Sequence, residues 1–226
     1  MEKMSVIFKD IFNDMKKRIV VAGSVFILII LIILIILIII FIRVDSNFVG
    51  FYNPNGKKIM NEYEELNDIE TEDGRRYPKV DISSNNKFVY TNINEILNVF
   101  NNDDSAVIYF SYPSCLYCRT AIKVLHDTAK DMEIDKIYYM DVENRVDGYD
   151  KLLDILGDKF VNNENNTREI FSPLVIFVDD GKIVSYNKGT LFSQETPYIA
   201  LDQSQIDGLS EIYIYGIMDV INAKSW

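Results

Sequence analysis

Two cysteines, three positions apart, are the residues of this sequence best suited to chemistry. They form the motif Cys115-Leu116-Tyr117-Cys118, and the chain has no other cysteine. An apolar run at 106–110 precedes the motif and a helical pattern follows it, which predicts a strand that leads into a helix at the cysteines. The unpaired N–H groups and partial positive charge of a helix N-terminus stabilise a thiolate. We therefore predict that Cys115 is the nucleophile in thiol–disulfide exchange and that Cys118, one turn along, resolves the mixed disulfide.

The same cysteine spacing also occurs in metal sites and in structural disulfides. A tetrahedral zinc site or an iron–sulfur cluster needs further ligands, and the chain has only one histidine, His126. We expect no metal and no cofactor, and we interpret His126 as a surface or half-buried residue of the helix after Cys118. A structural bridge between these two cysteines would close a very small loop and add little stability.

Hydrophobic periodicity predicts a mixed α/β domain around the motif. Asn92 and Glu95 form a capping-box pattern at the start of one helix, and Asp180-Gly181 between two apolar runs predicts a hairpin. The polar stretch 162–167 is expected to be a loop. Strands are expected at 106–110, 137–142, 174–178 and 183–186, and further helices at 92–100, 149–160 and 205–223. This order favours a mixed sheet with helices on both faces.

The order of elements resembles the thioredoxin family over about residues 92–221. The resemblance rests on the strand that leads into the cysteine pair, on the dipeptide Ser172-Pro173 before the strand at 174–178, and on the hairpin that follows. It implies a thioredoxin-like mixed sheet flanked by helices and a cis peptide bond before Pro173, facing the cysteines. The backbone of Ser172 would then be open to a substrate peptide. Ser172 and Pro173, with Tyr117 inside the motif, are our candidate substrate-binding residues.

Four positions depart from the family pattern. The tryptophan that is common before the first cysteine is Ser114 here, and Tyr109 stands where many thioredoxins carry a buried acid. That acid assists proton transfer when the mixed disulfide is resolved. The central dipeptide Leu116-Tyr117 has neither the Gly-Pro of typical reductants nor the histidine that favours strong oxidants. The direction of electron flow is therefore open.

A narrower resemblance concerns the motif and its surroundings. The pattern Tyr112-Pro113-x-Cys115-x-x-Cys118, behind an N-terminal anchor and with an inserted helix near 149–160, looks like the bacteriocin transport accessory proteins of Gram-positive bacteria. That resemblance implies a role in the maturation or export of a peptide, and a transporter or a membrane redox partner.

A long apolar run in the N-terminal part of the chain predicts a membrane anchor. Residues 19–42 are apolar except for Gly23 and Ser24, and as a helix they would span roughly 36 Å, enough for a hydrocarbon core of about 30 Å. No small-residue cleavage pattern follows, so we expect an uncleaved signal-anchor in the lipid bilayer. Lys16-Lys17-Arg18 precede the span and only Arg43 follows it directly. The positive-inside rule therefore predicts a single-pass protein of the cell membrane with residues 1–18 as a cytoplasmic tail.

The rest of the chain then lies outside the cytoplasm. The polar, acidic stretch 43–87 is expected to be a stalk with a short helix or hairpin, and 88–226 the thioredoxin-like domain. The formal net charge of −11 disfavours binding to nucleic acid, whose phosphates would repel the chain.

Two functions remain in view from the sequence. The first is an extracytoplasmic thiol–disulfide oxidoreductase that acts on the thiols or disulfides of proteins or peptides. The second is a non-catalytic thioredoxin-like module that serves a transport or peptide-maturation system and uses its disulfide only as a staple. Solvent access and reactivity of Cys115 would distinguish them.

Overall fold

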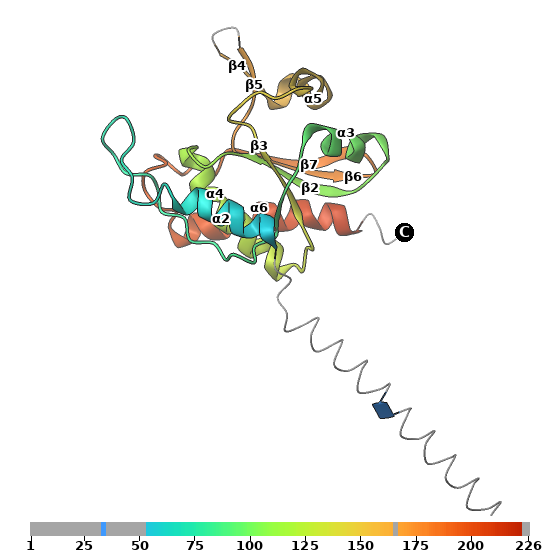
Figure 1. The fold of residues 1–226 in the computed structure, drawn as a ribbon, viewed down its shortest axis with the longest axis horizontal. Coiled ribbons are helices and arrows are strands. Elements are labelled where there is room, and N and C mark those ends of the chain that lie inside the picture. Colours follow the sequence, from blue (N-terminus) through green and yellow to red (C-terminus); the bar gives the residue numbers. More distant parts are fainter. Residues whose placement is uncertain (1–32, 35–52, 165–166, 223–226) are drawn as a thin grey trace, which may run out of the picture. The chain divides into compact units, whose positions relative to one another are not determined.

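The computed structural model describes residues 33–34, 53–164 and 167–222 (Figure 1). The chain divides into two compact units, 1–52 and 53–226, and the elements labelled below belong to the second. The predicted anchor, 19–42, lies outside the described residues apart from Ile33 and Leu34, which are helical. Within the described ranges, no helix has both the length and the apolarity that a bilayer crossing requires.

A five-stranded mixed sheet forms the centre of the second unit. Its strands lie in the order β1-β3-β2-β6-β7. The three on one side are parallel, and β6 and β7 continue the sheet in the antiparallel sense. The strands are β1 (Phe88–Tyr90), β2 (Ala106–Ser111), β3 (Ile137–Asp141), β6 (Leu174–Asp179) and β7 (Lys182–Lys188). The central strand β2 therefore leads from the middle of the sheet straight into the cysteine motif.

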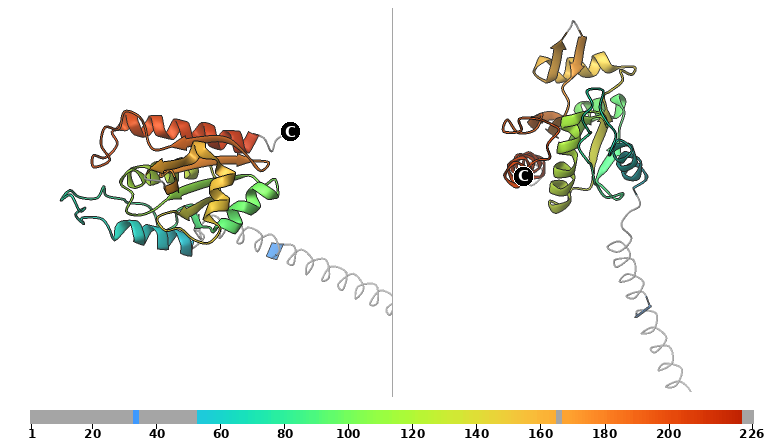
Figure 2. Two further views of the ribbon diagram at one scale, coloured as in Figure 1. Left: turned by 90° about the horizontal axis from the view of Figure 1, so that it is seen from above. Right: turned by 90° about the vertical axis from the view of Figure 1, so that its left-hand side faces the viewer.

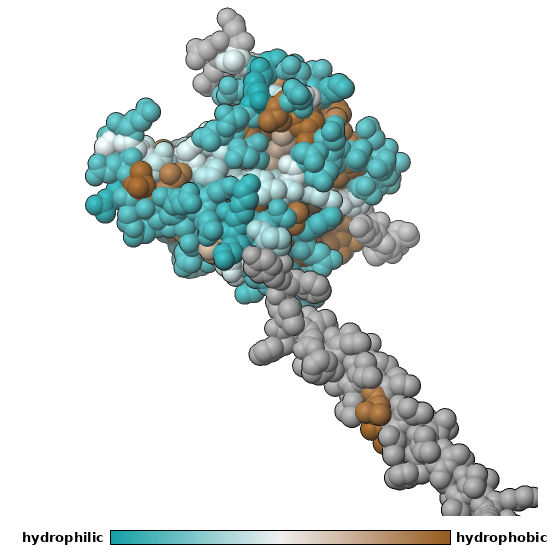
Figure 3. Space-filling model, in the orientation of Figure 1, coloured by the Kyte–Doolittle hydropathy of each residue, from teal (hydrophilic) through white to brown (hydrophobic). Residues whose placement is uncertain are grey.

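Alternating side chains of the central strands divide the core into two halves. On β2, Val107 and Tyr109 face one side, whereas Ile108 and Phe110 face the other. The first side is covered by α4 (Leu116–Asp131) and α6 (Gln203–Asn222), and the second by α3 (Ile93–Asn101) and α5 (Tyr149–Leu156). Figure 2 shows α6 lying along the sheet. Hydrophilic residues cover most of the described surface in the view of Figure 3, as expected when apolar side chains fill both halves of the core.

Two local features fix the antiparallel half of the sheet and its covering helix. Asp180 and Gly181 both have positive φ, 49° and 67°, and form the two-residue turn between β6 and β7 that the sequence predicts. A Cβ at Gly216 of α6 would lie 2.3 Å from the Phe177 ring. Because only glycine fits there, α6 can lie directly against β6.

Residues 53–87, which we expected to form a stalk, instead pack against the sheet. Helix α2 (Pro54–Glu64) begins after Asn53, whose side chain accepts a hydrogen bond from the Asn55 N–H. Ile59 and Tyr63 of α2 are fully buried, and Val80 and Ile82 after it are nearly so. The described unit therefore begins at Asn53 rather than at residue 88. The sequence did not predict this packing, because the segment is strongly polar and only a few apolar side chains attach it to the core.

We expected a loop over the polar stretch 162–167, but residues 162–164 and 167 belong to a second, two-stranded sheet. Strands β4 (Val161–Glu164) and β5 (Thr167–Ile170) pair in the antiparallel sense after a short 3₁₀ turn, η1 (Asp158–Phe160). The helix expected over 149–160 accordingly ends at Leu156. Cross-strand pairing supplied the β structure that asparagine-rich composition alone disfavours. The capping box of Asn92 and Glu95 is present as predicted.

Replacement of Tyr63 tests whether α2 belongs to the folded domain. Because Tyr63 is fully buried in the core and its hydroxyl is hydrogen-bonded, we expect Tyr63→Ala to lower the free energy of unfolding by about 3–5 kcal/mol. The matched control is Tyr215→Ala, since Tyr215 of α6 is 60% exposed, with an expected change within about 0.5 kcal/mol. Urea unfolding followed by circular dichroism measures both. Equal effects of the two substitutions would show that α2 is not part of the cooperative fold.

Candidate active site

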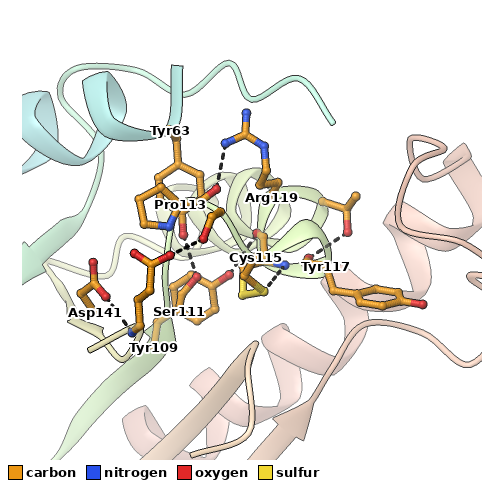
Figure 4. The surroundings of a disulfide bond; sticks show 12 residues. Tyr63, Tyr109, Ser111, Pro113, Cys115, Tyr117, Arg119 and Asp141 are labelled. Carbon is orange, nitrogen blue, oxygen red and sulfur yellow. Dashed lines mark hydrogen bonds between the residues drawn. A yellow bond between two sulfur atoms is a disulfide. The ribbon is translucent and has the colours of Figure 1, made fainter. Parts of the chain in front are cut away.

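The cysteine motif lies where β2 ends and α4 begins. Cys115 is the N-cap residue of α4, and it is joined to Cys118 in the first turn by a disulfide (Figure 4). The Cys118 backbone N–H donates to Cys115 Sγ over 3.1 Å. The sulfur thus receives one of the N–H groups that a helix leaves unpaired at its start, the position that favours a thiolate.

The two sulfur-bearing residues differ in exposure. Cys118 is fully buried, whereas Cys115 is 8% exposed. An incoming thiol or disulfide therefore reaches Cys115 and not Cys118. This asymmetry suits an attacking first cysteine and a resolving second one.

The predicted substrate-binding residues lie on two sides of the motif. The Ser172–Pro173 peptide bond is cis, as the resemblance implied. Pro173 is buried and Ser172 half-buried between β5 and β6. Tyr117 is 38% exposed and projects from the first turn of α4 to the side opposite Pro113 (Figure 4). Ser172 and Ser114, the residue before Cys115, line one shared groove, which does not include Tyr117.

Strand order, strand direction and the cysteine pair at the start of α4 together decide the fold. It is the thioredoxin-like fold. The observed order β1-β3-β2-β6-β7 forms a mixed sheet with helices on both faces, as the sequence predicted.

Comparisons with known proteins add one structural likeness. The sequence matches no protein-family model and no curated protein. Among solved structures, the chain is similar to oxidised thioredoxin O2 from Arabidopsis thaliana, at 17% sequence identity and a TM-score of 0.35. The match covers 56% of this chain and 93% of that one. The narrower resemblance to bacteriocin transport accessory proteins finds no support in these comparisons.

A buried tyrosine, Tyr109, lies beside the second cysteine of the disulfide. Tyr109 is fully buried, and its hydroxyl donates to the Cys118 carbonyl oxygen over 3.1 Å. Burial raises the pKa of Tyr109 well above its usual value, and the neighbouring phenols of Tyr63 and Tyr213 raise it further. The phenol therefore remains protonated at neutral pH and cannot accept a proton from Cys118.

Three further hydroxyl groups are buried near the end of β2 and are hydrogen-bonded to one another. The Tyr63 hydroxyl shares a hydrogen bond of 2.6 Å with Ser111 and one of 3.3 Å with Tyr139. Burial also raises the pKa values of Tyr63 and Tyr139. The interior near the motif is thus polar but uncharged, apart from one cation.

That cation is Arg119, the residue after Cys118. Its side chain is 1% exposed. Its guanidinium donates to the carbonyl oxygens of Pro78 over 2.7 Å and Pro113 over 3.0 Å, and to Asn67 Oδ1 over 2.8 Å. Burial lowers the pKa of Arg119 to about 10, so it stays charged at neutral pH. No carboxylate in the described part of the chain forms an ion pair with it.

Arg119 and Tyr63 were not among the residues we singled out from the sequence. A usable signal existed for Arg119, since it falls three residues before Ile122 on the buried side of α4. None existed for Tyr63, which belongs to a segment distant in sequence. His126 is buried on α4 rather than half-buried, and its ring lies 6.3 Å from that of Phe88. Burial lowers the pKa of His126.

Loss of the Arg119 guanidinium should destabilise the fold. Arg119→Met would leave the carbonyl oxygens of Pro78 and Pro113 and the amide of Asn67 without their charged donor. We expect a loss of about 2–4 kcal/mol in the free energy of unfolding. The control is Lys123→Met on the same helix, because Lys123 forms only an exposed 2.8 Å pair with Asp127, worth less than about 1 kcal/mol. Urea titration of the oxidised chain measures both. Similar losses for the two variants would refute a structural role of the buried guanidinium.

Proposed function

We propose that this protein is a thiol–disulfide oxidoreductase that acts on protein or peptide substrates through Cys115 and Cys118. The observation that carries the proposal is the placement of Cys115 as N-cap of α4, with a backbone N–H directed at its sulfur. In the reduced state this position favours the thiolate of Cys115, which attacks one sulfur of a substrate disulfide and displaces the other sulfur as a thiolate. Cys118, after losing its proton, attacks Cys115 Sγ, closes the protein disulfide and releases the second substrate sulfur as a thiolate; the two substrate thiolates take up protons from solvent.

The same steps in reverse oxidise a substrate dithiol. Reduction of a substrate requires loss of the Cys118 proton, which the protonated phenol of Tyr109 cannot accept. In oxidation, a substrate thiolate attacks Cys115 Sγ, Cys118 leaves as a thiolate and takes up a proton, and the second substrate thiolate then displaces Cys115 from the substrate sulfur. Because both directions use the same steps and the same proton, the equilibrium potential of the pair decides the direction, about −270 mV for a reductant and about −120 mV for an oxidant.

A non-catalytic module for a transport or maturation system is the second candidate function. Cys115 is only 8% exposed, which favours this candidate, because a purely structural disulfide needs no contact with a substrate. Such a module would keep its disulfide through its working life, whereas an oxidoreductase must open it.

We also propose that the domain works outside the cytoplasm, held to the membrane through residues 19–42. Support comes from the sequence alone. The apolar run is long enough to span a bilayer, and Lys16-Lys17-Arg18 precede it. A membrane redox partner or a transporter would be within reach of a domain held in this way.

Substitution of each cysteine separates catalysis from a structural staple. We expect Cys118→Ser to accumulate a mixed disulfide between Cys115 and a cysteine peptide, because the resolving thiol is gone. Cys115→Ser should abolish exchange, since Cys118 is fully buried. Mass spectrometry identifies the mixed disulfide. In the reduced wild-type chain, alkylation at neutral pH should modify Cys115 much faster than Cys118. Slow and equal alkylation would favour the non-catalytic module.

Membrane attachment and orientation are open to a direct test. We expect the full chain, expressed in bacterial cells, to remain with the membrane after alkaline carbonate washing, because its apolar run is buried in lipid. After mild reduction, an impermeant maleimide should label Cys115 in intact spheroplasts. Protection of Cys115 until the membrane is lysed would place the domain on the cytoplasmic side.

A further inference from the structure

A groove of about 520 Å³ lies beside the disulfide. Ser114, next to Cys115, and Ser172, next to Pro173, both line it. The remaining lining comes from the chain before β1, from the loop between β3 and α5 with the first residue of α5, and from β4, β5 and the residue after β5. We call it the Tyr112 groove, after the half-buried tyrosine that lines it where β2 has ended. A peptide whose cysteine reaches Cys115 must place its neighbouring residues near this groove.

Aromatic side chains contribute much of the lining of the Tyr112 groove. Tyr77, Tyr112, Tyr149 and Phe171 all take part. Their ring faces attract cations through the ring quadrupole. Arg145 already lies 5.0 Å from the centre of the Tyr149 ring, and Lys188 lies 4.9 Å from that of Phe171. The Arg119 guanidinium lies 5.5 Å from the centre of the Tyr77 ring. In the described part of the chain, no cation lies over the ring of Tyr112 in this way.

Carboxylates give the Tyr112 groove a negative charge. Glu143 and Glu169 line it, both are exposed, and neither forms an ion pair within the described residues. Glu143 instead accepts a hydrogen bond from the Ser114 hydroxyl, which leaves its charge uncompensated. The one cation in the described lining, Arg145, is paired with Asp150 over 3.1 Å.

Glu143 and Glu169 line the groove together with Tyr112, over whose ring no described residue places a cation. Burial raises the pKa of the Tyr112 phenol, and the charges of Glu143, Glu169 and Asp141 raise it further. The lining also holds a buried polar atom that has no hydrogen-bond partner among the described residues, Oγ of Ser172.

From this arrangement we propose that the Tyr112 groove binds the side chain of a lysine or arginine adjacent to the reacting cysteine of the substrate. The substrates are thus cysteine peptides or proteins with basic flanking residues. A cation held between Tyr112 and the two glutamates gains from ring and carboxylates alike. The inference rests on the proposed function, since it concerns the substrate of the same cysteine pair.

Charge-matched peptides test this inference on the full chain in non-ionic detergent. Each probe is a short capped peptide with one cysteine, flanked on both sides by Lys, Gln or Glu, and activated as its mixed disulfide with thionitrobenzoate. The reduced Cys115 thiolate attacks the sulfur of the peptide cysteine, thionitrobenzoate leaves as the coloured thiolate, and Cys118 then displaces the peptide thiolate. The absorbance of thionitrobenzoate gives the rate of the first step.

We expect the Lys probe to react about tenfold faster than the Glu probe at low salt. The difference should shrink in salt on the order of 0.5 M, because exposed charges are screened. The double variant Glu143→Gln/Glu169→Gln should lose most of the preference. The control, Glu133→Gln/Glu211→Gln, removes two exposed glutamates from other parts of the surface and should keep it. This control matters because the whole chain carries a net charge of −11.

The outcomes separate this inference from the proposed function. Equal rates for the three probes, or a preference that survives Glu143→Gln/Glu169→Gln, would overturn the inference and leave the oxidoreductase function standing. A preference lost equally in the control variant would assign it to overall charge and would also overturn the inference. Failure of every probe to react with Cys115 would overturn the proposed function together with the inference.

Discussion

The buried guanidinium of Arg119 connects parts of the molecule that the chain itself separates widely. A charged group that is 1% exposed is costly to bury unless its donors are satisfied. Here the acceptors are two proline carbonyls and an asparagine amide rather than a carboxylate. One of them, Pro113, lies two residues before Cys115, and the others, Asn67 and Pro78, belong to the segment before β1. The position of the cysteine loop is therefore tied to residues that precede the sheet.

This dependence explains why the segment 53–87 belongs to the site as well as to the fold. Asn67 accepts from Arg119 and also exchanges two hydrogen bonds with the Val80 backbone. Tyr63 of α2 bonds to Ser111 at the end of β2. Both contacts end close to the motif, one on the helix side and one on the strand side. A displacement of the segment 53–87 would therefore disturb both the helix and the strand that hold the cysteines.

The sequence predicts the features that depend on neighbouring residues better than those that depend on residues far apart in the chain. Four strands of the main sheet, the capping box at Asn92 and the Asp180-Gly181 turn were predicted because their signals are local, as was the cis bond before Pro173, through the family resemblance. The packing of α2 was not predicted, because it arises from contacts of a polar segment with distant partners. The hairpin of β4 and β5 was not predicted either, because its asparagine-rich residues disfavour strands. At the site, the cysteines and Ser172 were predicted from the motif and the resemblance. Arg119, Tyr63 and Glu143 were missed because their roles depend on what folding brings beside them.

Two opposing electrostatic effects meet at Cys115. The N-terminus of α4 and the Cys118 N–H favour a negative charge on its sulfur, and the charged Arg119, tied to Pro113 in the same loop, acts in the same direction. Glu143, bonded to the neighbouring Ser114, acts against it. Because Glu143 is exposed, solvent weakens its effect while it faces water. A cationic residue beside the substrate cysteine would cancel that opposing charge just as the two sulfurs meet. The groove would therefore contribute both to the choice of substrate and to the fraction of Cys115 that is thiolate when exchange begins.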